Sequence, residues 1–192
     1  EVGATATDLF FSEYIEGGSL NKAIEIFNGT GSPVNLSNYS VKASFNLNPF
    51  TTTMTLPDIE LADGDVYVIA NESANAAILA VADVTNNNIA NFNGNDAVGL
   101  FKNDVLIDII GVEAEDLGAG WNVAGVTDAT ADKTLVRKSS VQAGNTDWAA
   151  QAGTNADNSE WIVYAKDTTT YLGSHTMAGG SSSSYVTGFN NR

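Results

Sequence analysis

The feature that most constrains the fold is a succession of short apolar stretches that alternate with polar residues and end at turn signals. In residues 23–27, Ile24 and Ile26 share one face and Glu25 lies on the other, and a hairpin-type Asn28-Gly29 pair follows. This alternation predicts a strand that is exposed to water on one side. Further strands are predicted at residues 9–16, 39–45, 51–56, 66–70, 97–101, 105–110, 134–137 and 161–166. Short strands at this spacing predict a sandwich or a barrel.

One short helix is predicted among these strands. Ser73 can cap a run of good helix formers at residues 74–81, which follows the turn-forming Asn71. The chain has 192 residues, of which 43% are hydrophobic, and this suffices for one domain with a complete core. The predicted fold class is therefore all-β with one short helix.

The composition changes abruptly after Met177. Residues 178–184 read Ala-Gly-Gly-Ser-Ser-Ser-Ser, which is typical of a flexible linker. The next residues have strand character: Tyr185, Val186, Thr187, Gly188 and Phe189. We therefore divide the chain into a β-sandwich at residues 1–177, a linker at 178–184 and a C-terminal strand at 185–192. A strand on such a linker can be donated to the sheet edge of a neighbouring subunit.

Charge and cysteine content exclude several classes of function. The chain carries 23 Asp and Glu residues against 8 Lys and Arg, for a net charge of −15. Such a surface repels phosphate backbones, so nucleic acid is not expected as a partner of this chain by itself. No run of 18 apolar residues is present, and membrane insertion is therefore not expected. The absence of cysteine excludes thiol nucleophiles and zinc–thiolate sites.

Two features of the chain bear on its location. It begins at Glu1 rather than at an initiator methionine, as expected after removal of a leader. Acidic chains rich in Asn and Thr are common outside cells, where calcium is plentiful. We expect a secreted protein that is extracellular or held at the cell surface.

Several separated blocks of the sequence resemble one family. They read FSEYIEG at residues 11–17, NKAIEIFNGT at 21–30, NGNDAVGLF at 93–101, IDIIG at 107–111, DKTLVRK at 132–138 and SEWIVY at 159–164. In this order, over about residues 7–177, the chain resembles bacterial lamin tail domains. The resemblance implies an immunoglobulin-like β-sandwich. It also implies a module that is usually non-catalytic and accompanies secreted nucleases, phosphatases and surface proteins.

The inventory of reactive residues argues against catalysis. His175 is the only histidine, so any Ser–His pair or His-rich metal site would depend on it, and we interpret it as structural or surface-exposed. No Gly-rich loop leads from a strand into a helix as a phosphate cradle requires. With 23 acids on a sandwich, two carboxylates at glycosidase spacing would arise by chance. We predict that the chain is not an enzyme and requires no cofactor.

A structural Ca²⁺ is the metal that the acidic residues could bind. The candidate ligands lie on the first two predicted strands and on the central hairpin: Glu13, Glu16, Glu25, Asp96 and Asp108. By strict alternation Glu13 shares an apolar face with Phe11 and Ile15. An acid there needs a partner such as Lys22, a backbone amide or a cation. Hydrogen bonding or ion pairing without a metal is the alternative.

The three tryptophans suggest a second kind of ligand. Trp161 lies within an apolar strand, and we assign it to the core. Trp121 and Trp148 lie in polar loops, where they either cover the core or stack against a carbohydrate.

Two functions of different classes follow from these observations. The first is a non-catalytic structural or adhesive subunit, which forms a homo-oligomer or an extracellular filament by donation of residues 185–189. Its outside partner would be a carbohydrate or another surface ligand. The second is an accessory module, for targeting or binding, of a larger secreted enzyme such as a nuclease.

Overall fold

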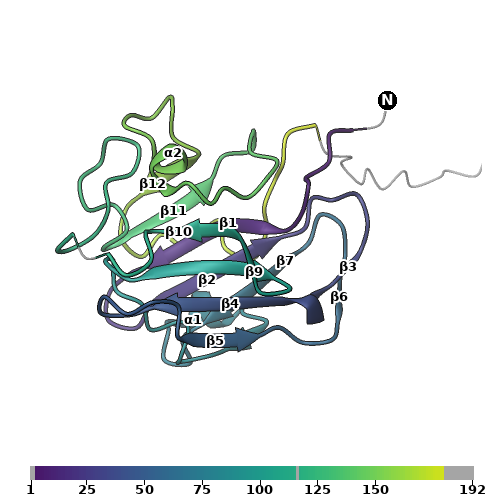
Figure 1. Cartoon of the computed structure of the whole chain (residues 1–192), viewed down its shortest axis with the longest axis horizontal. Helices are drawn as coiled ribbons and strands as arrows, with labels where there is room; N and C mark the ends of the chain where they lie inside the picture. The colour runs from purple at the N-terminus through teal and green to yellow at the C-terminus, as the bar shows by residue number, and fades with distance from the viewer. Residues whose placement is uncertain (1–2, 116, 180–192) are drawn as a thin grey trace, which may run out of the picture.

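Two sheets packed face to face make up the protein in a computed structural model, which describes residues 3–115 and 117–179 (Figure 1). The predicted strand at residues 185–189 lies outside the described residues. The large sheet has the order β12-β11-β1-β2-β7-β8 and the small sheet has the order β10-β9-β4-β5. All pairs are antiparallel except β7 and β8. The protein is thus an all-β sandwich.

The strand bounds agree closely with the sequence predictions. In the large sheet they are β1 (Phe10–Glu16), β2 (Lys22–Phe27), β7 (Val66–Ala70), β8 (Val84–Thr85), β11 (Lys133–Arg137) and β12 (Trp161–Tyr164). In the small sheet they are β4 (Tyr39–Ser44), β5 (Thr52–Thr55), β9 (Ala97–Lys102) and β10 (Val105–Ile110). The two-residue strands β3 (Val34–Asn35), β6 (Glu60–Leu61) and β8 were not predicted, since two residues carry no periodic signal.

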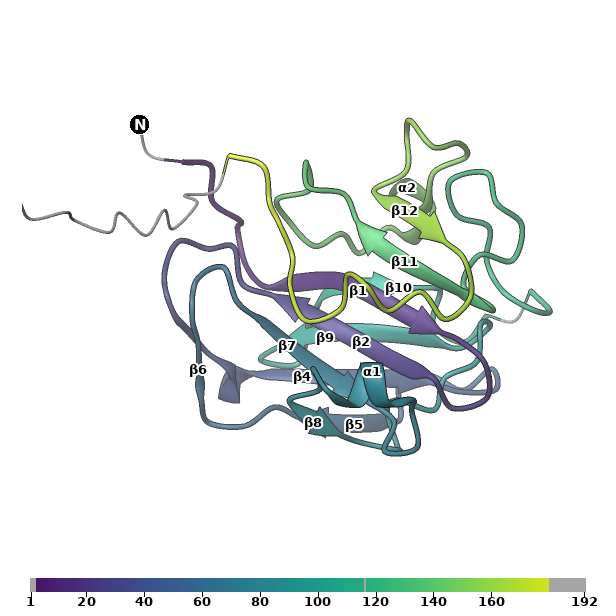
Figure 2. The same ribbon diagram turned by 180° about the vertical axis from the view of Figure 1, so that it is seen from behind.

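Both faces of the large sheet are buried, which corrects the prediction that β2 is wet on one side. Its inner face packs against the small sheet and supplies Phe11, Tyr14, Ile24 and Ile26 to the main core. Its outer face carries a second apolar cluster that includes Phe10. Residues 165–178, which we call the C-terminal strap, run across this outer face (Figure 2). The strap covers the face with two further residues of that cluster, Leu172 and Met177.

A β-bulge in β1 overturns the parity argument for Glu13. The register of β1 against β2 shifts between Phe11 and Glu13, and Glu13 lies opposite Glu25. One extra residue moves every following side chain to the other face. Glu13 therefore shares the outer face with Ile15, whereas Phe11 points into the main core.

The one helix that the sequence predicts, at residues 74–81, is shorter in the structure. Helix α1 spans Ala76–Leu79, and its N-cap is Asn75, whose side chain accepts a hydrogen bond from Ile78 N–H. The predicted cap Ser73 lies in the preceding turn. A second helix, α2 (Trp148–Ala152), was not predicted; Asp147 caps it. A 3₁₀ turn, η1 (Leu36–Asn38), precedes β4. None of the helices in the described part of the chain has the length and apolarity needed to cross a bilayer.

Candidate binding groove

A groove opens along one side of the sandwich, between the N-terminal segment, the edge of β10 and the loop that follows β11. It consists of two adjoining hollows of about 470 and 580 Å³. Thr7, Gly144 and Asn145 line both hollows. The first hollow continues toward Leu9 and Leu106, and the second toward residues 140–143. The hydrogen bond from Thr7 N–H to the Gln142 carbonyl, at 3.2 Å, ties the two walls together.

Strand β10 presents an open edge to this groove. It is the outermost strand of the small sheet, and the two-residue turn Asn103-Asp104 pairs Val105 with Lys102. This register places Val105 in a hydrogen-bonded pair, so the N–H and C=O of Leu106 point away from β9. Val105 is 64% exposed, and Leu106 and Ile107 are half-buried. At this edge, the main-chain N–H and C=O of Leu106 therefore lie next to apolar side chains.

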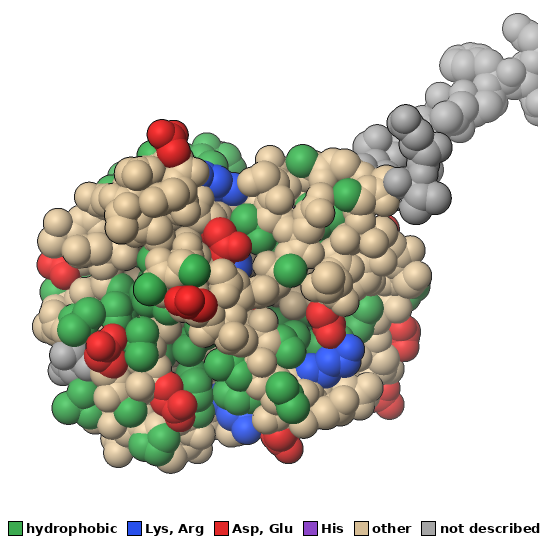
Figure 3. Space-filling view, turned by 45° about the horizontal axis from the view of Figure 1, so that its top comes forward, with side chains coloured by type: hydrophobic (Ala, Val, Ile, Leu, Met, Phe, Trp, Pro, Cys, Tyr) green, Lys and Arg blue, Asp and Glu red, His purple; other side chains and the backbone are tan. Residues whose placement is uncertain are grey.

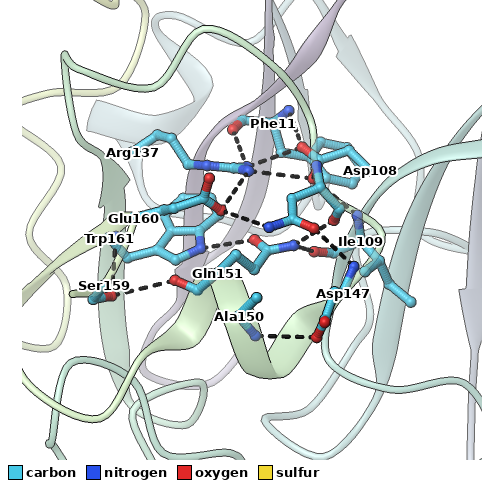
Figure 4. Close-up of polar contacts among 11 residues, drawn as sticks. Phe11, Asp108, Ile109, Arg137, Asp147, Ala150, Gln151, Ser159, Glu160 and Trp161 are labelled. Carbon is cyan, nitrogen blue, oxygen red and sulfur yellow. Dashed lines mark hydrogen bonds and ion pairs between the residues drawn. The ribbon is translucent and has the colours of Figure 1, made fainter.

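A buried ionic network supports the floor of the groove (Figure 4). Arg137 Nη1 lies 2.9 Å from Asp108 Oδ2, and both side chains are fully buried. Arg137 also donates to the Phe11 carbonyl at 3.0 Å and reaches Glu160 Oε2 at 3.3 Å. Its guanidinium lies 4.6 Å from the centre of the Trp161 ring. One arginine thus joins β1, β10, β11 and the start of β12.

The same network fixes the loop that forms the groove wall. Asp108 accepts hydrogen bonds from Phe11 N–H and from Asn145 N–H, at 2.8 and 3.0 Å. Gln151 donates to the carbonyls of Ile109 and Asn145 at 2.6 and 2.7 Å. A buried charge is tolerated only when it is paired and hydrogen-bonded, and Asp108 meets both conditions. Its carboxylate is therefore fully engaged within the protein.

The five acids predicted as calcium ligands are not gathered in one place. Asp108 belongs to the Arg137 network. Glu16 pairs with Lys22 Nζ at 3.1 Å and accepts from Asp132 N–H. Asp96 accepts from Asn46 N–H and Asn93 N–H, and so ties two loops together. In the part of the chain that the structure describes, no three acid or histidine side chains are placed to hold a metal.

Glu13 and Glu25 are the two predicted ligands that the fold brings side by side. Glu13 is 1% exposed, and neither of its carboxylate oxygens has a hydrogen-bond partner. Burial, with repulsion from Glu25, raises the pKa of Glu13 to about 9. Glu25 accepts from Ser12 Oγ at 2.6 Å and from Gly173 N–H of the strap at 2.7 Å. Burial raises the pKa of Glu25 to about 7, although these hydrogen bonds oppose the shift.

The aromatic candidates are all part of the protein interior. Trp161 is fully buried, as predicted. Trp121 and Trp148 are buried as well and pack edge to face, with their ring centres 6.4 Å apart. A sugar platform on these two rings is therefore wrong, and their other predicted role, covering the core, is correct. The polar loops conceal this because hydrophobic neighbours come from distant parts of the chain.

His175 has a structural environment. Its ring packs edge-on against Phe10 and Phe27, and Nε2 is buried without a hydrogen-bond partner. Burial, with the charge of Arg137, lowers the pKa of His175 to about 4. The side chain is therefore neutral at pH 7. It lies on the outer face of the large sheet, opposite the inner face that carries the main core.

Arg137 is the residue of the site that sequence reasoning missed. It is one of only 8 basic residues and follows the apolar pair Leu135-Val136 within a predicted strand. The argument that an acid on an apolar strand needs a partner applies equally to a base. Pairing buried acids with buried bases would have indicated Arg137 as a partner of Asp108.

On the face of the molecule that Figure 3 shows, acidic side chains are scattered among uncharged ones and a few basic ones. The fold defines the class: an immunoglobulin-like β-sandwich, of the kind that typically serves as a non-catalytic module.

Comparison with known families makes the assignment specific. The family model described as Lamin Tail Domain matches residues 3–114, and the chain belongs to this family. None of the curated proteins compared with the chain matches it. The matched region contains ten of the strands, but β11 and β12 lie beyond it and complete the large sheet beside β1.

Proposed function

We propose that the chain is a secreted, non-catalytic structural or adhesive subunit that polymerises into an extracellular filament, with residues 185–189 of each copy donated to the next. The observation that carries this proposal is that the sandwich is complete before the C-terminal tail, residues 180–192, begins. Met177 packs into the outer cluster, and Ala178 N–H donates to the Ser139 carbonyl at 2.7 Å. Ala178, the last residue of the strap, and Gly179 after it are both exposed. The tail thus starts from the surface of a finished domain.

The absence of catalysis is supported by what the reactive side chains already do. Asp108 is engaged by Arg137, Glu16 by Lys22, and His175 by two aromatic rings. A general base needs a free lone pair within reach of a substrate, and none of these three offers one at the groove. We expect no nuclease, phosphatase or glycosidase turnover from the purified chain.

The donation of the tail is tested by comparing particle sizes. The full chain should form filaments, while the chain ending at residue 179 and the variant Phe189→Asp should be monomers. Burial of three apolar side chains stabilises the contact at ~25 cal/mol per Å² of apolar area, whereas a charge cannot enter an apolar contact unpaired. Electron microscopy and light scattering measure the outcome. If full-length and shortened chains are both monomers at high concentration, strand donation is wrong.

The second function is favoured by the family itself. The chain belongs to the lamin tail domain family, and the resemblance to that family implies a module that would target or position a catalytic domain of the same protein. An intact-mass measurement on the native protein distinguishes the two functions. A native chain much longer than 192 residues supports the module, and one that ends at Arg192 removes the downstream enzyme.

Calcium and carbohydrate remain proposals about ligands. Glu13 and Glu25 are the place where Ca²⁺ is best supported, since two adjacent carboxylates can supply oxygen ligands. There Ca²⁺ must compete with the proton on Glu13, so millimolar Ca²⁺ should raise the melting temperature more at pH 9 than at pH 6. Equal melting curves with Ca²⁺ and with chelator at pH 9 would exclude the site. A carbohydrate or other surface ligand would have to use exposed polar residues, such as those of the groove.

A further inference from the structure

The first residues of β10 carry neither a charge nor a proline, although the strand bulges against β9 between Leu106 and Asp108. Natural edge strands are shielded by charge, proline, a bulge or a covering segment, because unpaired main-chain groups attract other strands. At the groove, residues 105–107 read Val-Leu-Ile, and Val105 is largely exposed. The second half of β10 is covered, since Gln151 and Asn145 bond to Ile109 and Asp108. Gly144 lies against the Ile107 carbonyl, so the uncovered part of the edge is the start of β10, at Val105 and Leu106.

We propose that residues 185–189 of a second copy of this chain occupy the groove as an added strand, antiparallel to residues 105–107 of β10. This inference rests on the proposed function and names the acceptor that strand donation requires. Tyr185, Thr187 and Phe189 alternate with Val186 and Gly188, so one side of the strand can cover the apolar edge. Main-chain hydrogen bonds to Leu106 would set the register.

Charge favours this occupant over other parts of the chain. The molecule carries a net charge of −15, so most of its surface repels a second copy. Asp167 is the last acid in the sequence, and residues 168–192 contain none. The groove itself includes Asp8 and Glu160, while residues 185–192 contain one base, Arg192. The tail is thus the stretch of this chain that an acidic neighbour repels least.

The direction of the strands favours a second copy over the chain's own tail. Leu9 and Leu106 line the same hollow and Phe11 N–H donates to Asp108, so the N-terminal segment and β10 run in the same direction. Gly179 lies beside Ala4, at the end of the groove where that direction starts. A tail that enters there would run parallel to β10, in a sheet whose pairs are all antiparallel.

A neighbour's tail enters freely from the far end. Donation from one copy into the next is a head-to-tail contact, which builds a filament when the rotation between copies does not close a ring.

The test uses full-length variants that block either the donor or the acceptor. Phe189→Asp blocks the donor. Thr7→Lys and Val105→Lys each place a long charged side chain at the groove; both positions are exposed, so the variants should fold. Ile162→Lys on the edge strand β12 is the matched control, since Ile162 is also exposed. Thermal melting confirms folding, and sedimentation velocity measures assembly.

We expect the wild type and Ile162→Lys to polymerise and the other three variants to remain monomers. Phe189→Asp mixed with Thr7→Lys should give 1:1 dimers and nothing larger, because one partner only donates and the other only accepts. A labelled peptide of residues 185–192 should bind Phe189→Asp. Adding Thr7→Lys to that variant should weaken peptide binding at least tenfold.

Each contrary result has a separate meaning. If the wild type polymerises, Phe189→Asp is a monomer and both groove variants still polymerise, the acceptor lies elsewhere and the inference is overturned while the proposed function stands. If the wild type is a monomer and the peptide binds nowhere, both are overturned. If the wild type is a monomer but the peptide binds Phe189→Asp and not the double variant, the groove holds the chain's own tail, which overturns donation by a second copy.

Discussion

At the scale of single residues, Glu13 links the fold to pH. The pKa of Glu13 is about 9 in the folded protein against 4.5 for the free side chain, so between these values the folded state holds a proton that the unfolded chain has released. The free energy of unfolding therefore falls as the pH rises from 4.5 to 9. Glu25, with a folded pKa of about 7, adds a decrease of the same sign up to that pH. His175, lowered from 6.5 to about 4, contributes an increase between those values.

The variant Glu13→Gln isolates the first effect at pH 7–9, above the range in which His175 and most of Glu25 titrate. Wild-type protein should lose about 2 kcal/mol of stability over this range, whereas the variant should lose little and should be the more stable protein at pH 9. Urea unfolding at several pH values measures the difference. The exposed Glu72→Gln is the control and should keep the wild-type slope. An unchanged slope in Glu13→Gln would show that Glu13 is ionised in the folded state.

At the scale of elements, Arg137 joins strands from both sheets. Replacing it by Met leaves the carboxylate of Asp108 buried without its counter-charge, and removal of one partner of a buried pair costs ~3–5 kcal/mol. The matched change Lys42→Met breaks a pair whose Asp104 is 88% exposed, and such pairs are worth about 0–1 kcal/mol. Urea unfolding at pH 7 compares the two. The double variant Asp108→Asn with Arg137→Met should recover part of the loss; no recovery would mean that Arg137 acts by packing alone.

At the scale of the whole molecule, the strap decides where the domain ends. A chain ending at residue 179 keeps every contact of the outer cluster and should unfold cooperatively at nearly the wild-type urea concentration. A chain ending at residue 165 keeps all the strands but loses Leu172 and Met177 from the cluster and the bond from Gly173 to Glu25. Each buried apolar side chain contributes about 1.5–3 kcal/mol, so this chain should lose several kcal/mol and expose the outer face. Equal stability of the two chains would show that the strap is not part of the domain.

Much of the fold could be predicted because its signals are local. Period-two alternation and turn pairs such as Asn28-Gly29 are properties of neighbouring residues, and they located the longer strands to within one or two residues. The candidate site was less accessible. Asp108 was named only as a candidate calcium ligand, because its partner Arg137 is 29 positions away. The groove arises from segments 5–9, 105–107 and 140–146, which no local pattern connects.

The sequence by itself determined the all-β class, the order of the principal strands, the poverty of reactive groups, the acidic character and the acid-free tail, because each of these depends on composition or on adjacent residues. Only the tertiary structure decided which face Glu13 occupies, since one inserted residue at the bulge reverses the parity of the strand. Tertiary structure alone also showed that the strap buries the second face of the large sheet. It showed as well that β10 is an edge strand with Val105 exposed at its start. Burial and pairing are properties of segments that meet in space, so they are fixed by the packing of the whole chain and not by any stretch of it.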